Sequence, residues 1–245
     1  MKKILTYLWK QNILTVEVVK SLLLDMAIGK FNPTQIAGLT SIYNMRPSSI
    51  IEIEGFRQEL LYLCLQINLN AFNAIDIVGT GGDKNTFNIS TLASFVVAGA
   101  GEKVIKHGNY ASSSIAGSAN ILEMLGCKFT TNVSHLKNLL EKAGICFLHA
   151  PLFYPAIKKI ASIRKNIGTK TLLNIIGPLL NPSENQYQLL GVNNMELARI
   201  YYYYLQKTKK NIPLFTVWMV MTKFLLLGPL NAIPNMANLI IFHNH

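Results

Sequence analysis

The sequence is poor in acidic residues. Its 245 residues include 12 Asp and Glu against 23 Lys and Arg, giving a formal net charge of +11, and no acid follows Glu196. The basic residues are scattered, without the stripe of charge and interleaved aromatic rings that single-stranded nucleic acid needs. The charge therefore favours attraction of an anionic small molecule, and a nucleic-acid module is a distant alternative.

Cysteine is also scarce, and long hydrophobic runs are lacking. Cys64, Cys127 and Cys146 stand singly, without the paired spacing of a disulfide framework or a metal site. This usage predicts reduced thiols and a cytoplasmic location. The apolar stretch 215–230 is interrupted by a lysine, a glycine and a proline, so it does not read as a membrane helix. The apolar run near the N-terminus is too short, and lacks the cleavage site, for a signal peptide.

The spacing of apolar residues divides the chain into two parts, and the residues after 217 fit neither of them. Residues 1–66 predict short helices, with Asn32 before a proline and Ser49 paired with Glu52 as helix-starting signals. From residue 71 to 217, short apolar strands alternate with helices, which predicts a mostly parallel α/β sheet. The expected strands are 74–78, 103–105, 145–150, 188–192 and 214–217. The expected helices are 88–101, 117–127, 134–143, 154–168 and one starting near 195. The fold class is therefore α/β, with a small all-helical N-terminal domain followed by a mostly parallel sheet domain.

Two polar loops follow successive strands. The first, "DIVGTGGDKNTFNIST" (76–91), places three glycines and then Asp83 between a strand and a helix that opens with Asn88, Ser90 and Thr91. Glycines expose backbone N–H groups, and a helix N-terminus attracts negative charge, so this pattern indicates phosphate or pyrophosphate binding. The alternative is an ordinary strand–helix turn with capping residues. The motif is neither a Walker motif nor a dinucleotide fingerprint.

The second loop, "KHGNYASSSIAGSANILEMLG" (106–126), begins with Lys106 and His107 and continues through a serine-rich segment. Lysine supplies a point charge for a phosphate. Taken alone, Lys106 reads as a solvated strand-end lysine and His107 as a structural histidine. Two such loops at neighbouring strand ends favour a shared anion site, because open α/β sheets bind ligands at that edge.

These two loops, together with "FLHAPLFYPAIKKIASIRKNIGTKTLLNIIGPLLNP" (147–182), "QLLGV" and "GKFNPTQIAGL", resemble the anthranilate phosphoribosyltransferase family of nucleoside-phosphorylase-like transferases. The resemblance runs almost continuously from residue 1 to about 217. It implies transfer of a phosphoribosyl group from phosphoribosyl pyrophosphate (PRPP) to the amine of anthranilate, a step of tryptophan biosynthesis. It also implies Mg²⁺ as cofactor and a homodimer formed through the helical domain.

The resemblance also assigns roles to residues. PRPP would be bound by Gly79, Gly82, Asp83, Thr86, Asn88, Ile89, Ser90, Thr91, Lys106, His107, Gly108, Ser112, Ser113, Ser114 and Ser118. Anthranilate would contact Gly79, Asn109 and Arg164. Ser90 would also be a ligand of Mg²⁺. From its helical pattern alone, Arg164 reads as a solvated arginine, and only the family likeness makes it a partner for the substrate carboxylate. No side chain is implied as a nucleophile, because the site works by positioning and charge neutralisation.

The sequence departs from the family at two places. After Asp83 the family commonly carries one more residue, often glycine, so the loop here is one residue short. After the strand at 214–217 the family has an Asp-Glu pair that binds Mg²⁺, and its chain continues well beyond; this pair is absent here.

The genetic code offers an explanation of the ending. Residues 218–223, "WMVMTK", require the codons TGG-ATG-GTN-ATG-ACN-AAR. Read from the third base of the Trp codon, they become GAT-GGT-NAT-GAC-NAA, which forces Asp, Gly and a second Asp and permits a following Glu. The expectation is therefore that residues 218–245 are an out-of-frame tail. The alternatives are an ordinary divergent ending that packs as helix or strand and, for the function, a pyrimidine nucleoside phosphorylase-like enzyme or a non-catalytic remnant.

Overall fold

The computed structural model describes residues 1–79, 88–111, 116–168, 171–185, 187–192, 194–207, 214–218 and 223–226; of the last two ranges, and of Lys158, Lys159, Ala161, Arg164 and Lys165, only the backbone is described. The chain divides into two compact units. The first unit comprises residues 1–66 and 150–182, and the second comprises 67–149 and 183–245. Residues 150–182 thus group with the N-terminal helices, whereas the sequence placed them in the α/β part.

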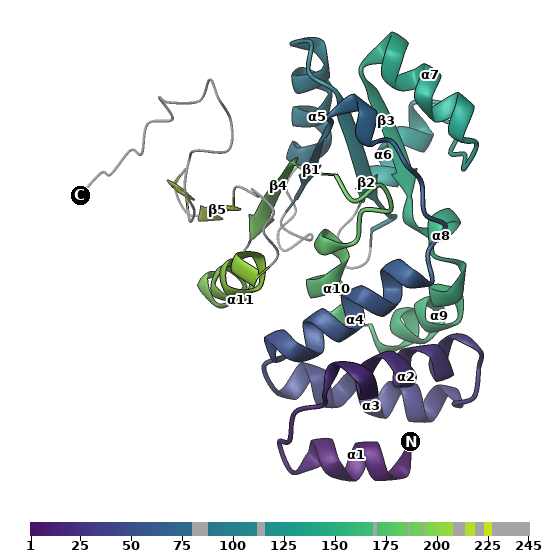
Figure 1. The fold of residues 1–245 in the computed structure, drawn as a ribbon, viewed down its shortest axis with the longest axis vertical. Coiled ribbons are helices and arrows are strands. Elements are labelled where there is room, and N and C mark those ends of the chain that lie inside the picture. The colour runs from purple at the N-terminus through teal and green to yellow at the C-terminus, as the bar shows by residue number, and fades with distance from the viewer. Residues whose placement is uncertain are drawn as a thin grey trace. The chain divides into compact units, whose positions relative to one another are not determined.

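The first unit is helical (Figure 1). Its helices are α1 (Lys2–Trp9), α2 (Val16–Ala27), α3 (Pro33–Met45), α4 (Ile50–Tyr62), α8 (Ala150–Phe153), α9 (Lys158–Ile167) and α10 (Leu172–Ile176). Capping boxes start α3, where Asn32 bonds the amide of Gln35, and α4, where Ser49 bonds the amide of Glu52. Both starts match the sequence signals. Leu22, Ile53 and Leu60 are among the fully buried side chains that hold this unit together.

The second unit is built around a sheet whose described strands lie in the order β3-β2-β1-β4-β5-β6. They are β1 (Ile75–Val78), β2 (Val104–Gly108), β3 (Ile145–His149), β4 (Tyr187–Val192), β5 (Leu214–Trp218) and β6 (Lys223–Leu226). Neighbours from β3 to β5 are parallel, and β6 runs antiparallel to β5. The helices between strands are α5 (Ile89–Gly99), α6 (Ser118–Met124), α7 (Val133–Ala143) and α11 (Met195–Lys207). The expectation of a helical domain and a mostly parallel α/β sheet domain is confirmed.

The described part of the ending adds one strand to this sheet. Residues 223–226 form β6 and pair with 215–218 of β5. This matches the alternative in which the ending packs as regular structure. The rest of the proposed tail, 219–222 and 227–245, lies outside the described residues. Within the described residues, no helix is long and apolar enough to cross a membrane.

Candidate functional site

The strand order places the two polar loops at a point where ligands bind in α/β proteins. After β1 the chain builds β2 and β3 on one side, and it then returns to add β4 and β5 on the other side of β1. The carboxyl ends of the strands beside such a reversal form a crevice in open parallel sheets. The glycine-rich loop follows β1 directly, and the Lys106 loop follows its neighbour β2. The fold therefore sets both loops at the same sheet edge.

Lys106 is the central charge of this edge. Its side chain is buried, with 3% of its surface exposed, and its ammonium donates to the carbonyl of Ile77 (2.5 Å) and to Ser90 Oγ (3.5 Å). Burial lowers the pKa of Lys106 to about 8, and the attraction of Asp76 limits the shift. The group is therefore mostly protonated at neutral pH. The interpretation of Lys106 as a solvated lysine is wrong.

Gly79 permits the close approach of β1 and α5. A Cβ added at Gly79 would lie 2.9 Å from Ser90 Oγ, closer than carbon and oxygen normally come. Any larger residue at this position would have to displace the Ser90 hydroxyl. Gly79, Ser90 and Lys106 are thus brought together by the fold, as the sequence predicted for a phosphate site.

The two polar loops are tied to each other where they rejoin regular structure. Asn88 Nδ2 donates to the carbonyl of Ala116 at 3.1 Å, and these residues follow the glycine-rich and the serine-rich segments respectively. Beside Asn88, Thr91 is buried, and its hydroxyl has no hydrogen-bond partner within the described residues. Ile89 is half exposed. A buried hydroxyl of this kind is a candidate donor to a bound ligand.

The turn after β2 is held by α6. The carbonyl of Asn109 accepts a hydrogen bond from the amide of Ala119 (3.2 Å), and Ser118 Oγ donates to the same carbonyl (3.5 Å). Asn120 Oδ1 accepts from the amides of Ala111 and Gly117, both at 2.9 Å. Ser118 and Asn109, two predicted site residues, are therefore in contact.

His107 and Gly108 form the last residues of β2. Burial lowers the pKa of His107 to about 3, with Lys106 and His149 adding repulsion, so the imidazole is neutral at pH 7. Gly108 lies against Ser118 and Phe147, and an added Cβ would clash with both. His107 therefore contributes no positive charge to this edge.

Other predicted site residues are not placed. Gly82, Asp83, Thr86, Ser112, Ser113 and Ser114 lie outside the described residues. Arg164 lies on α9 in the first unit, and its side chain is not among those described. Asn109, its predicted companion for anthranilate, belongs to the second unit.

The described residues do not make a site for Mg²⁺. No three His, Cys, Asp or Glu side chains within them gather as metal ligands. Ser90 offers one hydroxyl oxygen, and that oxygen lies beside the ammonium of Lys106. Mg²⁺ prefers carboxylate and phosphate oxygens, so these residues alone do not fit the ion.

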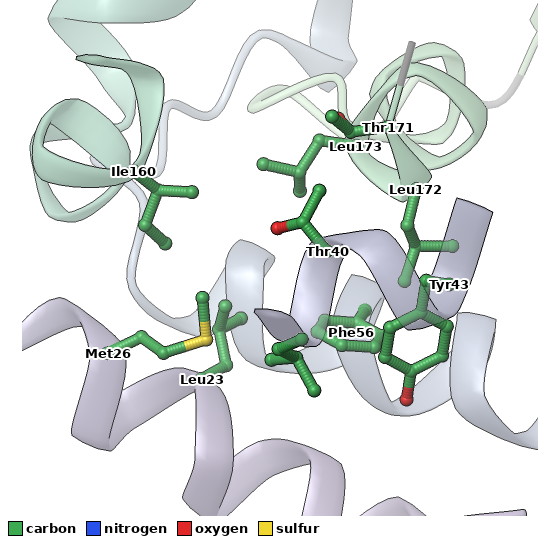
Figure 2. A pocket seen from close by; sticks show the side chains of 10 residues that line it. Leu23, Met26, Thr40, Tyr43, Phe56, Ile160, Thr171, Leu172 and Leu173 are labelled. Atoms are coloured by element: carbon green, nitrogen blue, oxygen red, sulfur yellow. The ribbon is translucent and has the colours of Figure 1, made fainter. Parts of the chain in front are cut away.

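A small apolar cavity lies in the first unit, whereas the predicted site residues with described side chains belong to the second. It has a volume of about 30 Å³ and is lined from α2, α3, α4, α9 and α10 (Figure 2). Leu23 and Met26 face it from one side, and Leu172 and Leu173 from another. Among its lining hydroxyls, Thr40 Oγ1 is occupied in donating to the carbonyl of Ile36. The cavity has room for one or two waters, and its mainly apolar lining is not suited to a phosphate.

Sequence reasoning missed Asp76 as part of the sheet edge. Asp76 lies on β1, is 1% exposed, and accepts hydrogen bonds from the amide of His107 (3.3 Å) and from Gln188 Nε2 (3.1 Å). The signal was available, because an aspartate stands inside the apolar strand "AIDIV" of a chain with few acids. Burying a carboxylate costs free energy unless it is hydrogen-bonded or paired, so an aspartate in a buried strand indicates buried partners.

These features define a mostly parallel α/β unit whose strand order reverses beside β1, with Asn88 and Ala116 hydrogen-bonded beyond the carboxyl ends of β1 and β2. Residues 71–218, more than half of the chain, match the family model described as "Glycosyl transferase family, a/b domain". The chain belongs to this glycosyl transferase family.

Two curated relatives from different bacteria are both anthranilate phosphoribosyltransferases. The anthranilate phosphoribosyltransferase of Flavobacterium johnsoniae is 52% identical over 212 residues, covering 86% of this chain and 64% of that protein. That of Bacteroides thetaiotaomicron is 47% identical over 210 residues, covering 85% and 63%. The chain thus spans slightly less than two thirds of the length of these relatives.

Solved structures agree with the fold. The anthranilate phosphoribosyltransferase of Thermus thermophilus superposes with a TM-score of 0.79 at 28% identity, covering 91% of this chain and 70% of that one. The Saccharomyces cerevisiae enzyme in complex with PRPP and Mg has a TM-score of 0.69 at 32% identity, covering 83% and 59%.

Proposed function

We propose that this chain has the site of an anthranilate phosphoribosyltransferase. In the reaction, the amine of anthranilate forms a bond to the anomeric carbon of PRPP. The bond from that carbon to pyrophosphate breaks, with its electron pair leaving on pyrophosphate, and the amine loses a proton. The products are phosphoribosyl-anthranilate and pyrophosphate. The observation that carries the proposal is the buried Lys106 ammonium beside Ser90 and Gly79, at the sheet edge where the family match lies.

The described residues support specific tasks in this reaction. Lys106 supplies a fixed positive charge for the leaving pyrophosphate, and the Ser90 and Thr91 hydroxyls supply hydrogen bonds to phosphate oxygens. Asn109, held by α6, and Arg164 are assigned to anthranilate. No described side chain is needed as a nucleophile, because the amine of the substrate attacks. Mg²⁺ is expected to bind together with PRPP, whose phosphate oxygens are ligands that it prefers.

The activity of this 245-residue chain is expected to be weak or absent. The family's acidic Asp-Glu pair is missing after β5, so one source of charge neutralisation is lost. The test is a turnover assay with anthranilate, PRPP and Mg²⁺, in which anthranilate loss and pyrophosphate release are followed together. Turnover close to that of the Flavobacterium johnsoniae relative would contradict the expected loss of activity. Binding of neither substrate would contradict the proposed site, leaving a non-catalytic remnant.

We further propose that the reading frame changes after Val217. The family match ends at residue 218, where the codon argument places the change. Sequencing the coding DNA is the test. The expected result is an Asp-Gly-x-Asp-Glu segment in the shifted frame followed by further family-like sequence. A shifted frame that stops, or that encodes nothing of this kind, would overturn the proposal, and β6 would then be an ordinary edge strand.

A cytoplasmic homodimer is the assembly we propose. Cys64, Cys127 and Cys146 form no disulfide, which fits a reducing compartment. On α1, Tyr7 and Trp9 expose 47% and 63% of their surfaces, an apolar pair suited to burial against a second helical unit. Sedimentation of the wild type and of Trp9→Glu tests this. A monomer in both would contradict the dimer.

A further inference from the structure

The strands β1 and β2 are paired through fewer residues than the adjacent strand pairs β1–β4 and β2–β3 are. β1 pairs with β4 over four residue pairs, from Ile75–Tyr187 to Val78–Leu190, and β2 pairs with β3 over five. Between β1 and β2 the register has the single pair Ile75–Val104. The backbone pairing between the two strands that lead into the polar loops is therefore limited to their amino ends.

Beyond this single pair, side chains of each strand bond backbone groups of the other. Asp76 Oδ1 on β1 accepts from the amide of His107 on β2, at 3.3 Å. In the opposite direction, Lys106 Nζ on β2 donates to the carbonyl of Ile77 on β1, at 2.5 Å. One acidic and one basic side chain thus link the two strands in opposite directions. We call Asp76 and Lys106, with these two bonds, the β1–β2 clasp.

The clasp is buried and anchored on a third strand. Asp76 and Lys106 expose 1% and 3% of their surfaces. The second carboxylate oxygen of Asp76 accepts from Gln188 Nε2 of β4, at 3.1 Å. Both oxygens of Asp76 therefore have a donor, which a buried carboxylate requires. The negative charge of Asp76 also attracts the ammonium of Lys106, which burial alone would disfavour.

We propose that Asp76 is a positioning residue of the site. It holds the end of β2 against β1 and so fixes the Lys106 ammonium beside Ser90, where that ammonium meets the pyrophosphate group of the ligand. Asp76 does not touch the ligand; it acts through Lys106. This inference rests on the proposed function and adds to it a residue that determines where the binding charge lies.

The position of Lys106 is tested without any ligand. In protein labelled with ¹³C at lysine Cε, the Lys106 resonance is assigned by its loss in Lys106→Met. Asp76→Asn keeps the shape of the side chain and removes its charge, and the resonance is expected to move toward the position of exposed lysines. Gln188→Leu keeps the charge and removes the anchor, and a smaller movement in the same direction is expected. An unchanged Lys106 resonance in both variants would overturn the proposal. If one of the two variants does not fold, the other still provides the test.

The consequence for binding is tested by a double-mutant cycle. Inorganic pyrophosphate, without metal, is titrated calorimetrically into the wild type, Asp76→Asn, Lys106→Met and the double variant. Asp76→Asn is expected to weaken binding about ten-fold in the wild type, the scale of one charge-assisted hydrogen bond. It is expected to have no further effect in Lys106→Met, because its action passes through Lys106. Equal effects in both backgrounds would overturn the proposal.

A matched control separates positioning from general stability. Glu52→Gln removes another buried carboxylate, in the first unit, and is expected to leave the pyrophosphate affinity of the folded protein unchanged. A loss of affinity in Glu52→Gln equal to that in Asp76→Asn would count against the proposal. If the folded wild type does not bind pyrophosphate, the proposed function fails, while the lysine resonance still decides whether Asp76 positions Lys106.

Discussion

Arg46 and Glu52 form a two-pronged ion pair inside the first unit, with Nη2 to Oε1 at 2.5 Å and Nη1 to Oε2 at 3.1 Å. Glu52 is fully buried and also accepts from Tyr43 and from the amides of Leu14 and Ser49. One carboxylate therefore fastens the segment before α2 and the start of α4 to the end of α3.

Replacing Glu52 by Gln is expected to destabilise the protein by about 3 kcal/mol, because the guanidinium of Arg46 stays buried without its counter-charge. Burial alone raises the pKa of Glu52, but the hydrogen bonds from Arg46, Leu14 and Ser49 outweigh it, so the pKa lies below its ordinary 4.5. A lowered folded-state pKa gives stability that is present above 4.5 and is lost as the pH falls through the folded value. The difference between wild type and Glu52→Gln is therefore expected to shrink below pH 4.5. Urea unfolding at a series of pH values measures it.

A surface pair provides the control for this prediction. Lys30 and Asp25 form an exposed ion pair at 3.0 Å, and the lysine exposes 61% of its side chain. Asp25→Asn is expected to change the unfolding free energy by less than about 1 kcal/mol. A loss in Glu52→Gln no larger than that in Asp25→Asn would contradict the buried network.

Gly117 is expected to tolerate no side chain. An added Cβ would lie 2.5 Å from the amide nitrogen of Ala111 and 2.8 Å from the carbonyl oxygen of Asn109, and backbone atoms cannot move away alone. Gly117→Ala should therefore displace the turn after β2 and weaken PRPP binding about ten-fold or more, the scale of one lost charged hydrogen bond. Titration calorimetry measures the affinity.

Gly99→Ala is the matched control for this substitution. Gly99 lies on α5, and an added Cβ there meets nothing within 4 Å. Alanine is favoured over glycine in a helix, so Gly99→Ala is expected to stabilise the protein by about 0.5–1 kcal/mol and leave PRPP affinity unchanged. Equal affinities in the two alanine variants would show that the turn is not held as described.

Substitutions of the residues that line the cavity of the first unit are expected to differ in their cost in stability. Leu39→Ala enlarges a space that is already empty of protein atoms and is expected to cost about 2–5 kcal/mol. Met26→Leu nearly conserves volume at the same cavity and is expected to cost less than about 1.5 kcal/mol. Chemical unfolding measures both. Similar losses in the two variants would indicate that this region repacks freely.

The cysteines are expected to differ in reactivity toward a thiol reagent. Cys127 is exposed, whereas Cys64 and Cys146 are buried. Burial also raises the pKa of Cys146 to about 12, so its reactive thiolate is scarce at about pH 8. One thiol should react quickly in the native protein, and Cys127→Ser should abolish that phase. A fast phase that persists in Cys127→Ser would contradict the burial of the other two.

Local signals in the sequence predicted much of the fold. Asn32 and Ser49 marked helix starts because capping is decided by residues three positions apart. The strands were placed within a few residues because buried parallel strands are short apolar runs. The stretch 154–168, expected as one helix, instead divides into a 3-10 turn at Pro155–Ile157 and the helix α9 at Lys158–Ile167.

Features that depend on distant residues were not predictable in this way. No local pattern indicated that 150–182 would group with the first helices, because that grouping depends on contacts between distant segments. Ser49 and Glu52 were identified as a cap, but the pairing of Glu52 with Arg46 and Leu14 is a tertiary contact. Lys106 was predicted to bind phosphate, whereas its link to β1 depends on the pairing of strands that are distant in the sequence.

The proposed PRPP site of this chain is built around Lys106. Calorimetric titration of PRPP with Mg²⁺ into the folded wild type and into Lys106→Met tests it most directly. Saturable binding is predicted for the wild type, weakened about ten-fold or more in Lys106→Met because a buried charge-assisted contact is lost. A folded wild-type chain that does not bind PRPP, or a Lys106→Met variant that binds it equally well, would contradict the claim.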